Sequence, residues 1–282
     1  MKWIAILVLI MNAMVAHAHP GVGIVMDSKG NVFYTDLQQV WKIDGQGRKS
    51  VAVRNVHTHE LYMDESDNLY GEHLWYNGER LDTWGHYVWK FSADGRFEKI
   101  IPDTEGFLTN YSFVRDHQGN MYWAHRDGAC QKLARKDIDG RISTQDDQCL
   151  KDIRWVTSTP TGSVYLVDLY DLKKIDQHGH VETLATQLQE RSFTQFFVND
   201  PHQLMGLTTD KNENVYVAVY GARKVKKITP GGKVFTVAET GMTWSPTGVL
   251  SAPNGDLWIL ESSPTNSVRV ERITKDGRRI IY

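Results

Sequence analysis

Residues 210–235 read DKNENVYVAVYGARKVKKITPGGKVF, and this stretch decides the fold. A polar turn from Asp210 to Asn214 precedes a run in which apolar residues alternate, and a second polar turn ending at Gly232 follows another such run. Alternation with a period of two residues is typical of β-strands, and polar turns closed by Gly or Asn are typical of hairpins. The stretch therefore predicts short antiparallel strands joined by tight turns.

Both turns recur along the chain. The second one consists of a basic residue, an apolar residue and a polar turn that ends in glycine, and its copies are 39 to 53 residues apart. Their glycines are Gly47, Gly95, Gly140, Gly179, Gly232 and Gly277. The first turn recurs ahead of aromatic-rich runs, clearly at 27–31, 64–68, 116–120 and 210–214 and more weakly at 158–163 and 252–256. Each repeat therefore holds four short strands and two tight turns.

Six such units predict an all-β protein, a six-bladed β-propeller with four antiparallel strands per blade. The alternative is a solenoid, which would leave long strand edges exposed, whereas closure into a ring removes them. The unit Asp-x-x-Gly-Asn-apolar-Tyr followed by Lys-Ile-Asp-x-x-Gly-Lys resembles the NHL-repeat propellers and the wider gluconolactonase/regucalcin-like superfamily. The resemblance covers residues 19–282. It implies the architecture and no single activity, because this superfamily includes lactonases, lyases and binding scaffolds.

Composition narrows the function classes. The chain carries 32 Lys and Arg against 34 Asp and Glu, so it lacks the basic surface of a nucleic-acid-binding protein. Two cysteines are too few for a multi-cysteine metal cage. Cys130 lies 9 residues before Asp139 and Cys149 lies 9 residues after Gly140, so antiparallel pairing across that turn places them opposite each other. We expect a disulfide within the third blade; a catalytic thiol is the alternative.

The first 18 residues differ from the rest. Lys2 is their only charge, an almost entirely apolar run follows, and Ala16-His17-Ala18 has the form of a cleavage site. This pattern predicts a signal peptide cleaved after Ala18, hence a secreted or periplasmic protein with one propeller domain at 19–282. An uncleaved membrane anchor is the alternative. No other segment is long and apolar enough to span a bilayer, and we expect a monomer.

Loop lengths indicate which end of the propeller carries function. The tight turns all lie at one end, because they join strands one to two and three to four. The long connections, 74–86, 102–111 and 186–203, must lie at the other end. Long loops on a rigid scaffold mark a binding face.

Ionisable residues gather on two adjacent blades near that end. We expect a divalent ion (Zn²⁺, Ca²⁺, Mg²⁺ or Mn²⁺) because imidazole and carboxylate groups are its usual ligands. The candidate ligands are His57, His59, Glu60, His73 and His125. His59, Glu60 and His125 are also candidate catalytic groups, and Arg154 is a candidate anion clamp. The alternative is that these histidines bond loop backbone or pack among aromatic rings.

Aromatic residues next to this cluster predict a ligand surface. Trp75, Tyr76 and Trp84 would form an aromatic lid, and His202 is a further candidate contact. The sequence thus favours a binder of a small polar molecule or glycan, with metal-dependent hydrolase or lyase (lactonase-like) activity. The alternative is a non-catalytic NHL-like scaffold for a protein, peptide or glycan.

Overall fold

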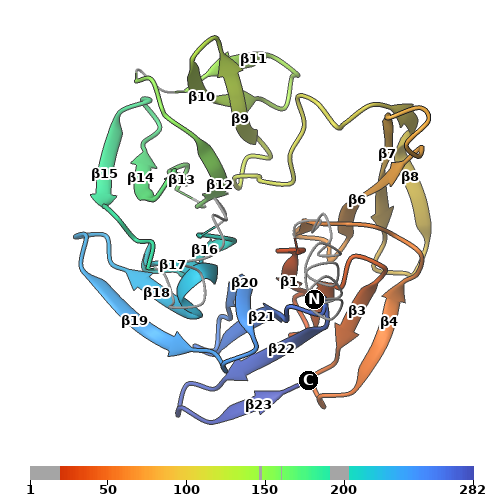
Figure 1. The fold of residues 1–282 in the computed structure, drawn as a ribbon, viewed down its shortest axis with the longest axis vertical. Helices are drawn as coiled ribbons and strands as arrows, with labels where there is room; N and C mark the ends of the chain where they lie inside the picture. Colours follow the sequence, from red (N-terminus) through yellow and green to blue (C-terminus); the bar gives the residue numbers. More distant parts are fainter. Residues whose placement is uncertain (1–19, 146–147, 160, 191–202) are drawn as a thin grey trace, which may run out of the picture.

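The computed structural model describes residues 20–145, 148–159, 161–190 and 203–282. Six sheets follow one another around a ring, as Figure 1 shows. The prediction of a six-bladed β-propeller is confirmed. Every blade is built from consecutive strands, so the first and last blades meet without sharing a strand.

The strands are as follows. Blade one holds β1 (Ile24–Met26), β2 (Val32–Thr35), β3 (Val40–Ile43) and β4 (Lys49–Val53); blade two holds β5 (Leu61–Met63), β6 (Leu69–Tyr76), β7 (Trp84–Phe91) and β8 (Phe97–Glu105). Blade three holds β9 (Met121–Asp127), β10 (Cys130–Lys136) and β11 (Ile142–Thr144); blade four holds β12 (Ile153–Ser158), β13 (Val164–Asp168), β14 (Asp171–Ile175) and β15 (Val181–Ala185). Blade five holds β16 (Leu207–Thr209), β17 (Val215–Val219), β18 (Lys224–Ile228) and β19 (Val234–Glu239), with a short 3₁₀ helix at Tyr220–Ala222; blade six holds β20 (Ser245–Ser251), β21 (Leu257–Ser262), β22 (Val268–Ile273) and β23 (Arg279–Ile281).

Blade three departs from the four-stranded plan. Its innermost strand is reduced to one bridge, between Arg115 and Met121, ahead of the three strands β9 to β11. The predicted Cys130–Cys149 disulfide is confirmed in this blade, with the two Cα atoms 5.1 Å apart. It ties the start of β10 to the segment where Leu150 pairs with Gln131.

Twelve turns share one geometry at one end of the ring. In each, the first residue donates its N–H to the carbonyl of the fifth, and the fourth residue, at positive φ, donates to the carbonyl of the first. Asp64 shows why the motif is Asp-x-x-x-Asn-x-Tyr: its carboxylate accepts bonds from the backbone and side chain of Asn68 and from the Tyr70 hydroxyl. Because the side chain closes its own turn, the motif specifies the hairpin locally.

Five of the six blade interfaces contain a buried apolar cluster. Blades one and two pack Phe33 against Leu69 and Trp89, and the interfaces three–four, four–five, five–six and six–one have clusters of the same kind. Among the described residues no such cluster joins blades two and three. The buried apolar residues of blade three on this side form a small group of their own, with Tyr111 packed on it. The ring is therefore tightly packed everywhere except between blades two and three.

Candidate functional site

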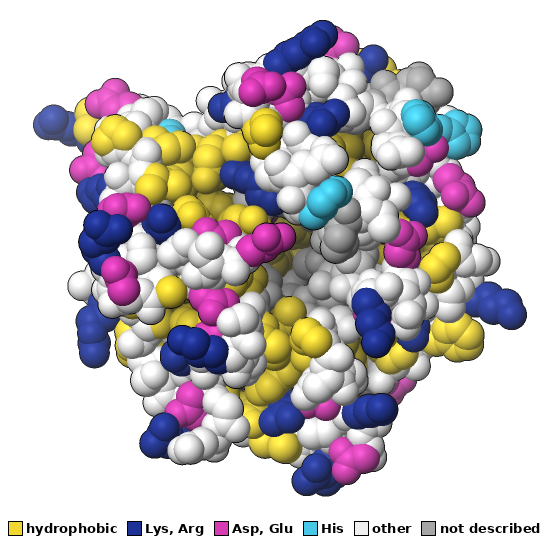
Figure 2. All heavy atoms as spheres, turned by 180° about the vertical axis from the view of Figure 1, so that it is seen from behind, with side chains coloured by type: hydrophobic (Ala, Val, Ile, Leu, Met, Phe, Trp, Pro, Cys, Tyr) yellow, Lys and Arg dark blue, Asp and Glu magenta, His cyan; other side chains and the backbone are white. Residues whose placement is uncertain are grey.

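A cavity of about 930 Å³ runs along the inner strands and opens toward the junction of blades two and three. Figure 2 shows the molecule hollowed toward its centre, with apolar side chains along the wall. Leu74, Phe107 and Trp123 line the part between the two blades. The ionisable side chains that line it include His59, Glu60, Glu72, Arg115 and Arg154 from blades two, three and four, together with Asp27, Asp64, Glu65 and Asp67.

Glycines allow the inner strands of the opposite wall to approach one another closely. A Cβ on Gly248 would lie 2.3 Å from the Val22 carbonyl oxygen, and one on Gly206 would lie 2.9 Å from the Thr247 carbonyl oxygen. The inner strands of blades five, six and one thus touch backbone to backbone. The Gly23 N–H donates to the His59 carbonyl at 2.9 Å and continues this contact to blade two.

Glu72, on β6, organises the segment that presents the site. Its side chain is buried, one carboxylate oxygen accepts the His59 backbone N–H at 2.5 Å, and the other accepts the Thr58 hydroxyl at 3.2 Å. The His59 Nδ1 atom lies 3.4 Å from the first of these oxygens. Because both oxygens have partners within the protein, Glu72 holds residues 58–60 in place.

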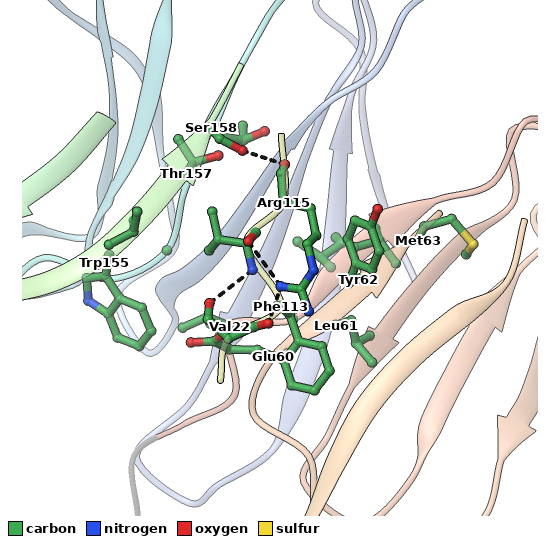
Figure 3. A pocket seen from close by; sticks show the side chains of 18 of the residues that line it. Val22, Glu60, Leu61, Tyr62, Met63, Phe113, Arg115, Trp155, Thr157 and Ser158 are labelled. Carbon is green, nitrogen blue, oxygen red and sulfur yellow. Dashed lines mark hydrogen bonds between the residues drawn. The ribbon is translucent and has the colours of Figure 1, made fainter. Parts of the chain in front are cut away.

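Glu60 projects into the cavity from the end of that segment (Figure 3). In the part of the chain that the structure describes, no hydrogen bond or ion pair reaches its carboxyl group. Burial, followed by the nearby Glu72 charge, raises the pKa of Glu60 to about 7, while His59 acts in the opposite direction. A carboxyl group with such a pKa can exchange a proton near neutral pH, as a general acid or base does.

Three of the histidines expected to bind a metal lie close together, and the ring centroids of His57 and His59 are 4.8 Å apart. The His73 Nδ1 atom accepts the His57 backbone N–H at 2.9 Å, and its ring stacks on Tyr87 at 4.7 Å. His125 lies on the exposed part of β9 and does not line the cavity. Burial is the main cause that lowers the pKa values of His57 and His73, which favours their neutral forms.

Metal binding by the five candidate ligands stays a prediction. Over residues 20–145, 148–159, 161–190 and 203–282, no three His, Cys, Asp or Glu side chains are arranged to hold an ion. Of the expected ligands, His59 and Glu60 face the cavity. The structural alternative for histidine, bonding to loop backbone and packing on aromatic rings, describes His73.

Arg154 and His202 are also predicted as site residues. Arg154 lines the cavity, but its Nε donates to the Asp152 carboxylate at 2.8 Å, so its charge is already paired within the protein. His202 lies outside the described residues.

The expected aromatic lid is instead an extended hairpin, because β6 continues to Tyr76 and β7 begins at Trp84. Trp75 packs near His73 and Tyr87 on one side of it, while Tyr76 and Trp84 lie 5.1 Å apart. These three residues do not line the cavity.

Sequence reasoning missed Arg115, which enters the cavity from blade three (Figure 3). An alignment of the repeats contains a signal for this residue. When the repeats are aligned on their first turns, the residue before the turn is Met26, Met63, Ser158, Thr209 or Ser251 in the other blades and Arg115 in the third. A single long cation at an inward position of one blade is a departure that the alignment could have flagged.

Comparison with known proteins identifies the fold. No family model matches the sequence, and no curated protein sequence matches it significantly. Solved structures do match. A streptogramin B lyase is 15% identical, with 95% of this chain and 84% of that chain covered and a TM-score of 0.55. A putative gluconolactonase is 14% identical, with 92% of this chain and 89% of that chain covered and a TM-score of 0.58. A calcium-binding regucalcin from Agrobacterium tumefaciens is 13% identical, with 87% of this chain and 82% of that chain covered and a TM-score of 0.54. The predicted likeness to gluconolactonase/regucalcin-like propellers is confirmed at the level of the fold.

Proposed function

We propose that this protein is a small-molecule hydrolase or lyase that works in the central cavity, with Glu60 as its general base. One observation carries the proposal: the Glu60 carboxyl group has a pKa of about 7, has no hydrogen-bond or ion-pair partner among the described residues, and lines a cavity of about 930 Å³. A volume of this order suits a small organic ligand. The fold supports the same class, because its structural neighbours include a streptogramin B lyase and a putative gluconolactonase.

The chemistry follows from the position of the carboxyl group. Ionised Glu60 accepts a proton, from water in a hydrolase or from carbon in a lyase, and the protonated acid returns it to the leaving oxygen. The aromatic and apolar wall limits access of water to the reacting group. Both proton transfers are carried by the carboxyl group of Glu60.

We also propose that residues 1–18 are a signal peptide and that the mature protein is secreted or periplasmic. The Cys130–Cys149 disulfide supports this, because disulfides persist in oxidising compartments. No helix among the described residues is long and apolar enough to cross a membrane.

Replacing Glu60 tests the proposed function. Protein starting at His19 is assayed with gluconolactone, virginiamycin B, quinupristin and puromycin, substrates or ligands suggested by the names of its structural neighbours. Where the wild type turns over a probe, Glu60→Gln should lower kcat by about 10²- to 10⁴-fold, because the amide cannot accept the proton. The wild-type kcat/KM should rise with pH around an apparent pKa near 7, since the base must be ionised.

Glu79→Gln, at the hairpin tip, is the matched control and should keep wild-type turnover. Activity within twofold of wild type in Glu60→Gln would refute the role of Glu60. A protein that turns over none of the probes yet binds a macromolecular partner would favour the non-catalytic scaffold.

A further inference from the structure

Arg115 is a half-buried cation with no ion-pair partner among the described residues. Its side chain is half-buried at the cavity wall, and in the described part of the chain no carboxylate forms an ion pair with it. Burial is the largest cause that lowers its pKa, and the main opposing influences come from Tyr111 and Tyr62 rather than from an acid. Removing a guanidinium from water without a counter-ion is unfavourable, so such a group favours an anionic ligand.

Two acids near Arg115, one on its own blade and one on the neighbouring blade, are held in their own turns. Asp116 accepts bonds from the Asn120 side chain and the Tyr122 hydroxyl, at 2.8 and 2.9 Å. Asp64, on the neighbouring blade, is held in the same way by Asn68 and Tyr70. Each carboxylate closes its own turn, and neither forms an ion pair with Arg115.

The guanidinium is held in one orientation. Its NH1 atom donates to the Ser112 carbonyl and, at 3.1 Å, to the Val114 carbonyl. The rings of Tyr62 and Tyr111 lie 5.8 and 5.3 Å from its central carbon, one from each of the adjoining blades. NH1 donates to backbone and the guanidinium also hydrogen-bonds the Tyr111 side chain. A guanidinium carries five N–H donors, so donors remain for a ligand beyond these contacts. Two parallel N–H donors match the two oxygens of a carboxylate.

We propose that the cavity binds a substrate through a carboxylate group, held by the guanidinium of Arg115 between Tyr62 and Tyr111. The inference deepens the proposed function and rests on it in treating the bound anion as substrate. Glu60 lines the same cavity from the neighbouring blade (Figure 3). The carboxylate would thus fix the substrate while the rest of the molecule extends toward Glu60.

Calorimetric titration with benzoate, a flat carboxylate, tests the subsite, with neutral benzamide as its isostere. We expect benzoate to bind at least about tenfold more tightly than benzamide, because a charge-assisted bidentate contact is lost in the amide. Arg115→Gln should weaken benzoate binding by about tenfold or more. Arg126→Gln, at an exposed position of the same blade, should leave it unchanged.

Arg115→Lys provides a second variant if the glutamine variant does not fold. It keeps the charge but not the planar fork, so benzoate binding should fall while the melting temperature stays near that of the wild type. Equal binding of benzoate and benzamide, or equal binding by wild type and the Arg115 variants, would overturn the proposal. Tighter Arg115-dependent binding of inorganic phosphate than of benzoate would overturn the carboxylate assignment.

The Glu60→Gln variant separates this inference from the proposed function. It should still bind benzoate, because Arg115 is intact, while it loses turnover. If benzoate binding does not depend on Arg115 but Glu60→Gln abolishes turnover, the subsite is wrong and the general base stands. If benzoate binding depends on Arg115 but Glu60→Gln keeps full turnover, the carboxylate subsite stands and the general base is wrong.

Discussion

Two glutamates near the cavity show how local partners decide the chemistry of a residue. Glu72 is surrounded by donors from the 58–60 segment and acts as a positioning group. Glu60, at the end of that segment, lacks such donors and has a pKa raised to about 7, chiefly by burial. Both positions are visible in the sequence, but the difference between them depends on which backbone groups surround each carboxylate. Of the two, Glu60 is therefore the one able to exchange a proton with a ligand.

Glu60→Gln should also change how stability depends on pH. The folded-state pKa of about 7 lies above the ordinary value of 4.5, so folding favours the protonated acid. This contribution is fully present below about pH 4.5 and is lost as the pH rises through 7. The melting temperature of Glu60→Gln relative to wild type should therefore be higher at pH 8 than at pH 5, by about 2 °C or more. Differential scanning calorimetry with Glu79→Gln as control measures this; an identical difference at both pH values would contradict it.

At the scale of the element, blade three is the least regular part of the ring. Its innermost strand is a single bridge, its outer strand β11 has three residues, and it lacks a shared core with blade two. The disulfide joins its third strand to the segment after its fourth. This covalent link supports the blade whose packing is weakest.

Removing the disulfide should destabilise the protein measurably. Because the bridge closes a loop between residues 19 apart, we expect the Cys130→Ser, Cys149→Ser double variant to lose about 2–4 kcal/mol of unfolding free energy. Thermal melts with and without reductant check this. Reductant should lower the melting temperature of the wild type and leave that of the double variant unchanged. A wild type indifferent to reductant that fully reduces the bridge would contradict the expectation.

At the scale of the molecule, two junctions between blades differ in their packing: blades six and one, at the closing junction of the ring, share a buried cluster, and blades two and three do not among the described residues. Blades six and one meet through a buried cluster that includes Ile24, Tyr34 and Trp258, and Tyr282 stacks on Trp258 at 5.5 Å. Between blades two and three the cavity takes the place of such a cluster. The opening thus gives a ligand a route to Glu60 and Arg115 without loosening the closing junction.

Tyr282→Ala tests the closing junction. The loss of its ring should reduce the free energy of unfolding by about 1–3 kcal/mol, less than for a fully buried aromatic residue because Tyr282 is half-buried. Phe235→Ala, on outer strand β19 and 50% exposed, is the matched control and should change stability by about 0.5 kcal/mol or less. Denaturant unfolding measures both. Equal effects would show that the last residue does not help to hold the ring closed.

The sequence by itself determined the hairpins, the number of blades and the disulfide. These depend on local chemistry: an Asp side chain that closes its own turn, strand alternation, and two cysteines placed symmetrically about one turn. Repeat alignment also places Glu60 at the position where blades one, five and six carry glycine.

Only the tertiary structure decided what these residues meet. The Nδ1 atom of His73 is occupied by the backbone of His57, Arg154 is paired with Asp152, and Arg115 lies between tyrosines of two blades. Such contacts cross from one strand or one blade to another. A repeat specifies which way each side chain points, but the partners it finds depend on how closely adjacent blades pack. Because no buried apolar cluster joins blades two and three among the described residues, the cavity extends between them.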